Sequence, residues 1–179
     1  MKKALILILT TGMTIGSIYA LIHYIGMQSF SFAWILNFLL MASVLTFTET
    51  LKSPLTSPYF DTKPWERKGE IYESFGIHIY RKLLVLTGWE KLNKKANPIA
   101  KNISALTHLY YKTKQSELGH IVILFVVFSF NIFVAFQYGI VKSLWLLILN
   151  ILLNLYPVLL QRYNRPRIAR AISLSKFSR

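Results

Sequence analysis

Four long apolar runs constrain the fold of this chain more than any other feature. They cover about residues 4–25, 32–47, 118–138 and 140–160, and only Lys142, near the start of the fourth, places a Lys, Arg, Asp or Glu inside a run. Each run approaches the roughly 20 residues that an α-helix needs to cross the hydrocarbon core of a bilayer. Within a bilayer, a helix satisfies its backbone hydrogen bonds internally. The sequence therefore predicts an all-α integral membrane bundle of four transmembrane helices, forming a single membrane domain over residues 1–179.

Positive charge is concentrated in the segments that four spans place on one side of the membrane. The chain has 21 Lys and Arg residues against 7 Asp and Glu residues. Of the 21, 20 lie before the first run, in segment 51–117, or after residue 160. Because loops rich in Lys and Arg stay in the cytoplasm, we expect both termini and segment 51–117 to be cytoplasmic. The first run, which follows Met-Lys-Lys, is also compatible with a signal peptide, but its length and the lack of a small-residue cleavage site favour a retained helix.

The central segment 51–117 combines a proline-containing loop with amphipathic stretches. Residues 52–64 contain several prolines and predict an extended loop. In residues 70–92, apolar side chains recur at helical spacing among basic ones: Ile71, Phe75, Ile79, Leu83 and Leu86, with Arg81, Lys82 and Lys91 between them. This pattern predicts amphipathic helices at the cytoplasmic membrane interface. A third piece, from about Pro98 to Lys112, is expected to lead directly into the third span.

Polar residues within the third and fourth runs are candidates for a site. Glu117 and His120 are three residues apart, so they share a helix face where the third helix enters the membrane. An acid and an imidazole are costly there unless they are paired or face a wet cavity. In the fourth run, Asn150, Asn154 and later Gln161 fall on one helix face. The alternative is that Glu117 and His120 are ordinary interfacial side chains and that the amides only bond neighbouring helices.

An arginine-rich stretch, QRYNRPR, follows the fourth run directly. The fixed fork of donors on Arg162 and Arg165 suits a phosphate group, whereas the alternative is a membrane-surface anchor that needs only charge. Pro166 disfavours helical geometry at Arg165, so we expect the helix to end there. A third cluster, around Glu66, Glu70 and Glu73 with His78 and Arg81, reads either as a site or as a solvated helix face.

Several classes of function are excluded or disfavoured. The absence of cysteine excludes disulfides, thiolate metal sites and a cysteine nucleophile. The chain has no phosphate-binding glycine loop, and its histidines lack zinc-protease spacing. Its basic residues flank membrane spans instead of forming a soluble module, so nucleic-acid binding is not expected. We expect neither a cofactor nor a bound metal.

Three motifs together resemble a known family. They are Glu66, Gly69 and Tyr72; then Lys114, Glu117, Leu118 and His120; and then Gln161 to Arg167. In this order they resemble the glycosyl-4,4'-diaponeurosporenoate acyltransferases, small bacterial membrane proteins that attach a fatty acyl group to a sugar in staphyloxanthin-type carotenoid synthesis. The resemblance covers roughly residues 60–170. It implies a multi-pass protein of the bacterial inner (plasma) membrane.

The resemblance also implies a reaction and its participants. A long acyl chain would move from a thioester donor, acyl-CoA or acyl carrier protein, to a hydroxyl of a lipid or glycolipid acceptor. We expect His120 as general base, Glu117 as the residue that orients it, and Asn164 as an oxyanion donor. Substrate binding is expected from Arg162 and Arg165, which would hold donor phosphate or polarise the carbonyl, and from Lys114, Arg81, Glu66, Tyr72 and Asn154.

Two other functions remain open on the sequence. One is a non-enzymatic lipid-binding or scaffold protein, which would use the arginines for headgroups but would not need His120. The other is a metal-assisted lipid hydrolase built on Glu117, His120 and the upstream acids, which requires a bound metal.

Overall fold

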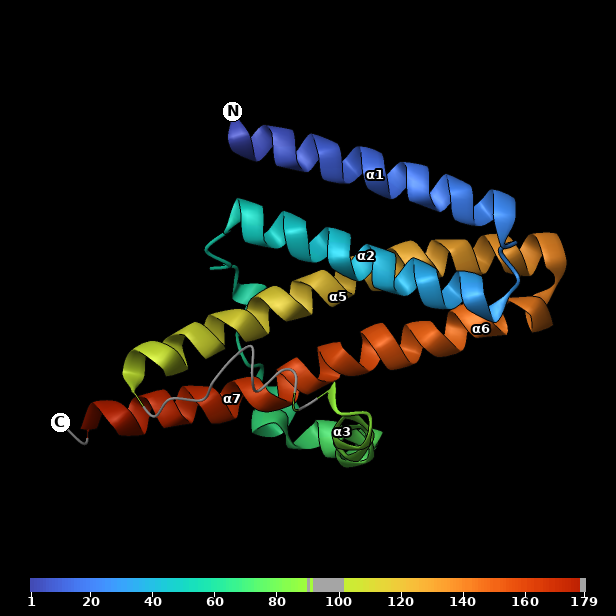
Figure 1. The fold of residues 1–179 in the computed structure, drawn as a ribbon. Helices are drawn as coiled ribbons and strands as arrows, with labels where there is room; N and C mark the ends of the chain where they lie inside the picture. Colours follow the sequence, from blue (N-terminus) through green and yellow to red (C-terminus); the bar gives the residue numbers. More distant parts are fainter. Residues whose placement is uncertain (90, 92–101, 178–179) are drawn as a thin grey trace. The chain divides into compact units, whose positions relative to one another are not determined.

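The computed structural model describes residues 1–89, 91 and 102–177, and within these ranges the chain is helical with no strand (Figure 1). Four helices are long and apolar enough to cross a membrane: Lys2–Tyr24, Phe30–Leu51, Ile103–Tyr138 and Ile140–Lys176. This confirms the prediction of an all-α membrane protein with four membrane-spanning helices.

The first two helices form a pair joined by a short turn. α1 (Lys2–Tyr24) and α2 (Phe30–Leu51) flank Gly26, which adopts a positive φ of 80°. Ser29 caps α2, since its hydroxyl accepts a hydrogen bond from the Phe32 backbone N–H at 3.0 Å. Midway along the pair, the hydroxyls of Thr14 and Ser43 lie 2.7 Å apart. The pair therefore combines apolar packing with one hydrogen bond between its two helices.

The third apolar run belongs to a much longer helix. α5 (Ile103–Tyr138) has 36 residues, which gives a length of roughly 54 Å, against about 30 Å for the hydrocarbon core of a bilayer. Its later part contains the predicted span 118–138, and its earlier part contains most of the expected piece before it. Pro98 and Ile99, which also belong to that expectation, lie outside the described residues.

The fourth run continues into the arginine-rich stretch without a break. α6 (Ile140–Asn150) passes into a π-helical turn, η3 (Ile151–Leu155), and then into α7 (Tyr156–Phe177). The prediction that the helix ends at Arg165 is wrong, because α7 carries Pro166 in its interior. A proline inside a helix costs about 3 kcal/mol. The residues on both sides of Pro166 make side-chain hydrogen bonds: Arg165 Nε donates to Thr113 Oγ1, and Arg167 Nη1 donates to the Tyr163 carbonyl at 2.5 Å.

The chain forms two compact units. The first contains residues 1–54 and 118–157, and the second contains residues 55–117 and 158–179. The first unit has an apolar core with contributions from α1, α2, α5 and α6: Leu21, Met27, Phe32, Ala33, Leu36, Leu40, Ile123, Val127, Val134, Leu146 and Leu149. The long apolar helices thus meet through aliphatic and aromatic side chains, with a few polar residues buried among them.

The second unit consists of short elements packed on the ends of longer helices. It includes the 3₁₀ turn η1 (Pro58–Phe60), the irregular segment η2 (Pro64–Phe75) and α3 (Ile77–Leu86). α3 is apolar on two faces, since Ile77 and Tyr80 are buried whereas Ile79, Leu83 and Leu86 are exposed. An exposed apolar stripe beside basic residues is typical of a helix at a membrane interface, and the interfacial location of α3 stays a prediction.

The charge distribution gives a testable topology. Reporter domains fused after Gln28 and after Gly139 should appear outside the cell, because both positions lie at the ends of helices opposite to the Lys- and Arg-rich segments. A reporter at the carboxyl terminus is the control and should be cytoplasmic. Activity of a cytoplasm-specific reporter at Gln28 or Gly139 would rule out this orientation.

Candidate functional site

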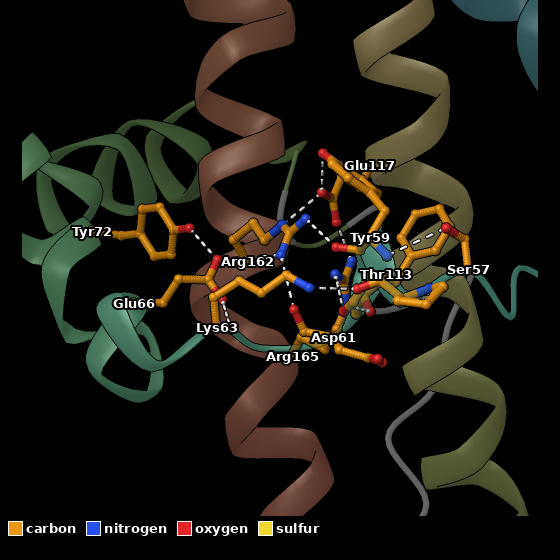
Figure 2. Close-up of polar contacts among 12 residues, drawn as sticks. Ser57, Tyr59, Asp61, Lys63, Glu66, Tyr72, Thr113, Glu117, Arg162 and Arg165 are labelled. Atoms are coloured by element: carbon orange, nitrogen blue, oxygen red, sulfur yellow. Dashed lines mark hydrogen bonds and ion pairs between the residues drawn. The ribbon is translucent and has the colours of Figure 1, made fainter.

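The second unit is built around the buried carboxylate of Glu117 on α5 (Figure 2). Its Oε1 accepts hydrogen bonds from Arg162 Nε at 2.7 Å and from the Tyr59 hydroxyl at 2.9 Å. Its Oε2 accepts a hydrogen bond from Arg165 Nη2. A buried charge is tolerated when it is paired and hydrogen-bonded, and Glu117 meets both conditions through two arginines of α7.

Arg165 is the largest of the fully buried side chains among the described residues, with a relative exposure of 1%. Besides Glu117, it donates from Nε to Thr113 Oγ1 at 3.1 Å and from Nη1 to the Phe60 carbonyl at 3.0 Å. Each of its three nitrogens therefore has a protein acceptor. Arg165 ties α7 to α5 and to the turn η1.

Arg162, one helical turn earlier on α7, contacts the same turn from the other side. Its Nη2 donates to the Tyr59 carbonyl at 2.7 Å, and its Nη1 lies 3.3 Å from the Asp61 carbonyl. Its guanidinium carbon lies 4.6 Å from the centre of the Tyr59 ring. With Arg165 on the Phe60 carbonyl, the two arginines hold three consecutive backbone carbonyls.

A second buried acid, Glu66, completes the group. Its Oε1 accepts from the Tyr72 hydroxyl at 2.5 Å and lies 3.2 Å from Arg162 Nη1, and its Oε2 accepts from the Lys63 backbone N–H at 2.6 Å. We call Glu66, Glu117, Arg162 and Arg165 the Arg–Glu cluster. Its two positive and two negative charges balance, so it offers little net charge to attract the phosphate expected from the sequence.

The spacing Glu66–Gly69–Tyr72 has a structural explanation. Gly69 has a φ of 95° and lies so close to α7 that a Cβ would stand 3.0 Å from the Tyr163 carbonyl oxygen. Only glycine adopts this conformation at no steric cost. The close approach places Glu66 and Tyr72, on either side of Gly69, where they bond each other. The motif therefore packs η2 onto α7.

Burial shifts the acid–base behaviour of the tyrosines in this unit. Burial raises the pKa of Tyr72 well above its ordinary value, and the hydrogen bond to Glu66 raises it further. Burial likewise raises the pKa of Tyr59, and it raises the pKa of Tyr80 to about 12. These side chains stay protonated at neutral pH, and Tyr59 and Tyr72 donate hydrogen bonds to Glu117 and Glu66.

Three other residues with predicted roles, Lys114, Asn164 and Arg81, are not part of the Arg–Glu cluster. Lys114 donates from Nζ to the Leu55 carbonyl at 3.2 Å. Asn164 is half-buried on α7, and at 100° per residue it projects about 200° away from Arg162. Arg81 is exposed on α3 and takes no part in the contacts described for the Arg–Glu cluster.

The acidic cluster predicted upstream is divided in the structure. Glu66 is buried in the Arg–Glu cluster, whereas Glu70 and Glu73 are exposed. Glu73 lies 3.3 Å from Arg167 Nη2 and 3.6 Å from His78 Nε2. These exposed pairs contribute little to stability, so the alternative of a solvated helix face describes Glu70 and Glu73 best.

His120 belongs to the first unit, where it bonds the amide side chain of Asn154 and the backbone of Leu153. Its Nδ1 lies 3.3 Å from Asn154 Oδ1 in η3. The sequence predicts Glu117 as the residue that orients His120, but the structure gives His120 a different side-chain partner and commits the oxygens of Glu117 to Arg162, Arg165 and Tyr59. The expected convergence of His120 with the Arg–Glu cluster stays a prediction.

Asn154 is the centre of a buried amide network. Its Nδ2 donates to Asn37 Oδ1 at 2.7 Å and to Asn150 Oδ1 at 2.8 Å, and all three amides are almost completely buried. We call Asn37, Asn150 and Asn154, with His120, the amide network. It is centred on the π-helical turn, where the Tyr156 N–H bonds the Ile151 carbonyl. Such turns are frequent at functional sites.

Asn37 belongs to the amide network, but it was not predicted from the sequence. It is an isolated amide in an apolar run, and the cost of a polar group in such a run is the one signal that could have drawn attention to it.

The polar stripe predicted in the fourth run, which includes Asn150 and Gln161, does contact α5. Asn150 Nδ2 donates to the Leu124 carbonyl at 3.0 Å, and Gln161 Nε2 donates to Ser116 Oγ at 3.2 Å.

The described part of the chain contains no group of three or more His, Asp or Glu side chains placed to hold a metal ion. Glu117 and the upstream acid Glu66 are instead paired with arginines. The metal-assisted hydrolase alternative therefore has no ligand set among these residues.

The fold and these residues define a helical integral membrane protein in which a network of buried amides bonds a histidine. The family model for glycosyl-4,4'-diaponeurosporenoate acyltransferase matches residues 56–174, and the chain belongs to this family of acyltransferases. The match confirms the resemblance seen in the sequence and includes the Arg–Glu cluster, His120 and Asn154. It does not include α1 or α2. Comparisons with curated proteins and with solved structures gave no match.

The geometry of Arg165 predicts that lysine cannot replace it. Arg165→Lys keeps the positive charge but cannot place three donor nitrogens toward three acceptors. At least one buried acceptor then loses its hydrogen bond, which destabilises the fold by about 1–3 kcal/mol for each acceptor. We expect a lower melting temperature of the purified protein in detergent. Arg170→Lys, at an exposed position on the same helix, is the control and should melt like the wild type. If Arg165 instead held donor phosphate, the Lys variant would show an unchanged melting temperature and a higher half-saturation for donor.

The raised pKa of Tyr72 predicts a loss of stability at alkaline pH. The folded protein keeps the phenolic proton at a pH where the unfolded chain releases it, so the stabilisation is complete below pH about 10 and falls as the pH rises above it. Tyr72→Phe should be less stable at neutral pH, because Glu66 loses a donor, and should lose less stability between about pH 9 and about pH 11. Melting temperatures across this range test the prediction, with the exposed Tyr24→Phe as control. Parallel alkaline losses in wild type and Tyr72→Phe would contradict it.

Proposed function

We propose that the protein transfers a long-chain acyl group from a thioester donor to a sugar hydroxyl of a glycosyl carotenoid or a related glycolipid. Membership of the acyltransferase family supports acyl transfer to a glycosylated carotenoid. The four apolar helices provide the environment that an acceptor with a long apolar chain requires. The thioester nature of the donor and the choice of hydroxyl are parts of the proposal.

The observation that carries the mechanism is the His120–Asn154 pair. An imidazole that is held at one nitrogen can accept a proton at the other, and histidine has the pKa range that suits a general base. In the proposed step, the acceptor hydroxyl attacks the thioester carbonyl carbon while the second ring nitrogen of His120 takes the hydroxyl proton. The C–S bond then breaks, and His120 returns the proton to the leaving thiolate. Because the chain has no cysteine, a cysteine-bound acyl intermediate is excluded, and direct transfer is part of the proposal.

The Arg–Glu cluster has a positioning role in this proposal. Glu117 and His120 lie three residues apart on α5, so a rotation of α5 that broke the bonds of Glu117 would also turn His120. Arg162 and Arg165 prevent such a rotation by holding Glu117 from α7. Glu66 and Tyr72 support the same cluster and need not touch the substrate.

Donor phosphates then require cations outside the cluster. Arg67 and Lys68 are exposed and follow Glu66 directly in the chain. Both are held in the left-handed region, with φ values of 47° and 54°. Strain of this kind, about 1–3 kcal/mol for each residue, is concentrated at functional sites. We assign these two side chains, with Lys114, to the electrostatic attraction of the donor.

The proposed role of His120 predicts a large loss of turnover in His120→Ala. A positioned general base contributes about 10²–10⁴-fold to the rate, and protein level and membrane insertion should stay normal. The measurement is the amount of acylated glycolipid, determined by mass spectrometry of lipid extracts from cells that express each variant at a matched level. His108→Ala, which removes an exposed histidine from the same helix, is the control and should retain full activity.

The same extracts test the non-enzymatic alternative. A scaffold or lipid carrier would tolerate His120→Ala, and the acylated product would persist. Near-wild-type product from this variant would therefore overturn the proposed role of His120.

A further inference from the structure

Asn37 on α2 is an amide at a position where an apolar side chain would fill the space equally well. It has a relative exposure of 0% and is surrounded along its helix face by Ala33, Leu36 and Leu40, all of them buried. Burying an amide costs free energy unless it is hydrogen-bonded. Since it lies outside the segment that matches the family, its purpose has to be read from its bonds.

Both polar atoms of Asn37 have partners, and one of these partners fixes the orientation of the amide. Nδ2 donates to the Ala33 carbonyl at 2.8 Å. A backbone carbonyl can only accept a hydrogen bond, so the amide nitrogen must face Ala33. Oδ1 must then face Asn154, whose Nδ2 lies 2.7 Å away.

Asn150 repeats this arrangement from another helix. Its Nδ2 donates to the Leu124 carbonyl at 3.0 Å, which leaves its Oδ1 as the acceptor for Asn154 Nδ2 at 2.8 Å. Asn154 Nδ2 therefore donates to two oxygens, Asn37 Oδ1 and Asn150 Oδ1. Neither of these amides can flip to present its nitrogen instead, because that nitrogen is bonded to a backbone carbonyl. Asn154 must present its Oδ1 to His120.

An oxygen facing His120 Nδ1 requires that this nitrogen carry a proton. We infer that Asn37 and Asn150 are positioning residues that fix the tautomer of His120 through Asn154, leaving the lone pair on Nε2. The Ala33 and Leu124 carbonyls fix which end of Asn37 and of Asn150 is the nitrogen. These two amides in turn fix the orientation of the Asn154 amide. This inference rests on the proposed role of His120 as base and assigns the nitrogen that accepts the proton.

The tautomer can be measured without turnover. The chain has four histidines, and replacement of His23, His78 and His108 by glutamine leaves His120 alone. In protein labelled with ¹⁵N at the histidine rings and reconstituted into lipid bilayers, solid-state NMR distinguishes a protonated from an unprotonated Nδ1. We expect a protonated Nδ1 and an unprotonated Nε2. A neutral ring protonated at Nε2 would overturn the inference.

The combined variant Asn37→Leu with Asn150→Leu removes both acceptors and should free the amide of Asn154 to turn. Leucine has a similar size and suits an apolar helix, and the presence of folded protein is checked by the yield of the monodisperse purified form. We expect the Nδ1-protonated signal to be lost or mixed with that of the other tautomer. Keeping one acceptor, in the single variant Asn150→Leu with Asn37 unchanged, should retain the Nδ1-protonated signal.

Asn131→Leu is the matched control, because Asn131 is a buried amide of the same unit that bonds the Ser143 carbonyl and takes no part in the network. It should leave the tautomer unchanged. The double Leu variant should also lower kcat by at least about tenfold with little change in KM, since a wrong tautomer removes the base without removing substrate contacts.

The two readouts separate the inference from the proposed function. If the double variant keeps a protonated Nδ1, the inference is wrong whatever the activity. If the tautomer changes as expected but His120→Ala remains active, the inference stands and the role of His120 as base is wrong.

Discussion

The pairing of one buried carboxylate, Glu117, with two arginines of α7 is the interaction on which the second unit depends. Removing one partner from such a group leaves a buried charge uncompensated, which costs far more than the pair contributes. The same arginines hold the backbone of the turn from Tyr59 to Asp61. Glu117 and the two arginines therefore specify how α5, α7 and this turn pack within the second unit, and they contribute little net stability.

Sequence reasoning was most successful where one physical quantity decides the outcome. Hydropathy measures the cost of placing a residue in a bilayer, so it located the four spanning helices. It also singled out Glu117, Arg162 and Arg165, since charged residues at these positions require an explanation. The phosphate role that the sequence suggested for these arginines stays a prediction. Their bonds to the backbone carbonyls of residues 59–61, about 100 positions away, could not be foreseen, because a carbonyl has no residue-specific signal.

Local rules failed where tertiary contacts reversed them. Pro166 was expected to end a helix, but α7 continues across it, and the neighbouring Arg165 bonds Thr113 and the Phe60 carbonyl, which are distant in sequence. Asn37 was overlooked because a single amide in an apolar run has no periodicity. Its importance depends on Asn154, 117 positions away in sequence. Neither outcome can be derived from residues close in the chain.

The amide network has a consequence for the path of protons. Side-chain amides hold their hydrogens tightly and, unlike carboxylates, hydroxyls or water, do not pass a proton along a chain of hydrogen bonds. Asn37, Asn150 and Asn154 therefore insulate one edge of His120 from the interior of the helices. A proton taken up at the opposite edge has to leave by that edge. In the proposed reaction, a proton removed from the acceptor hydroxyl at that edge is available at the same edge for the departing sulfur.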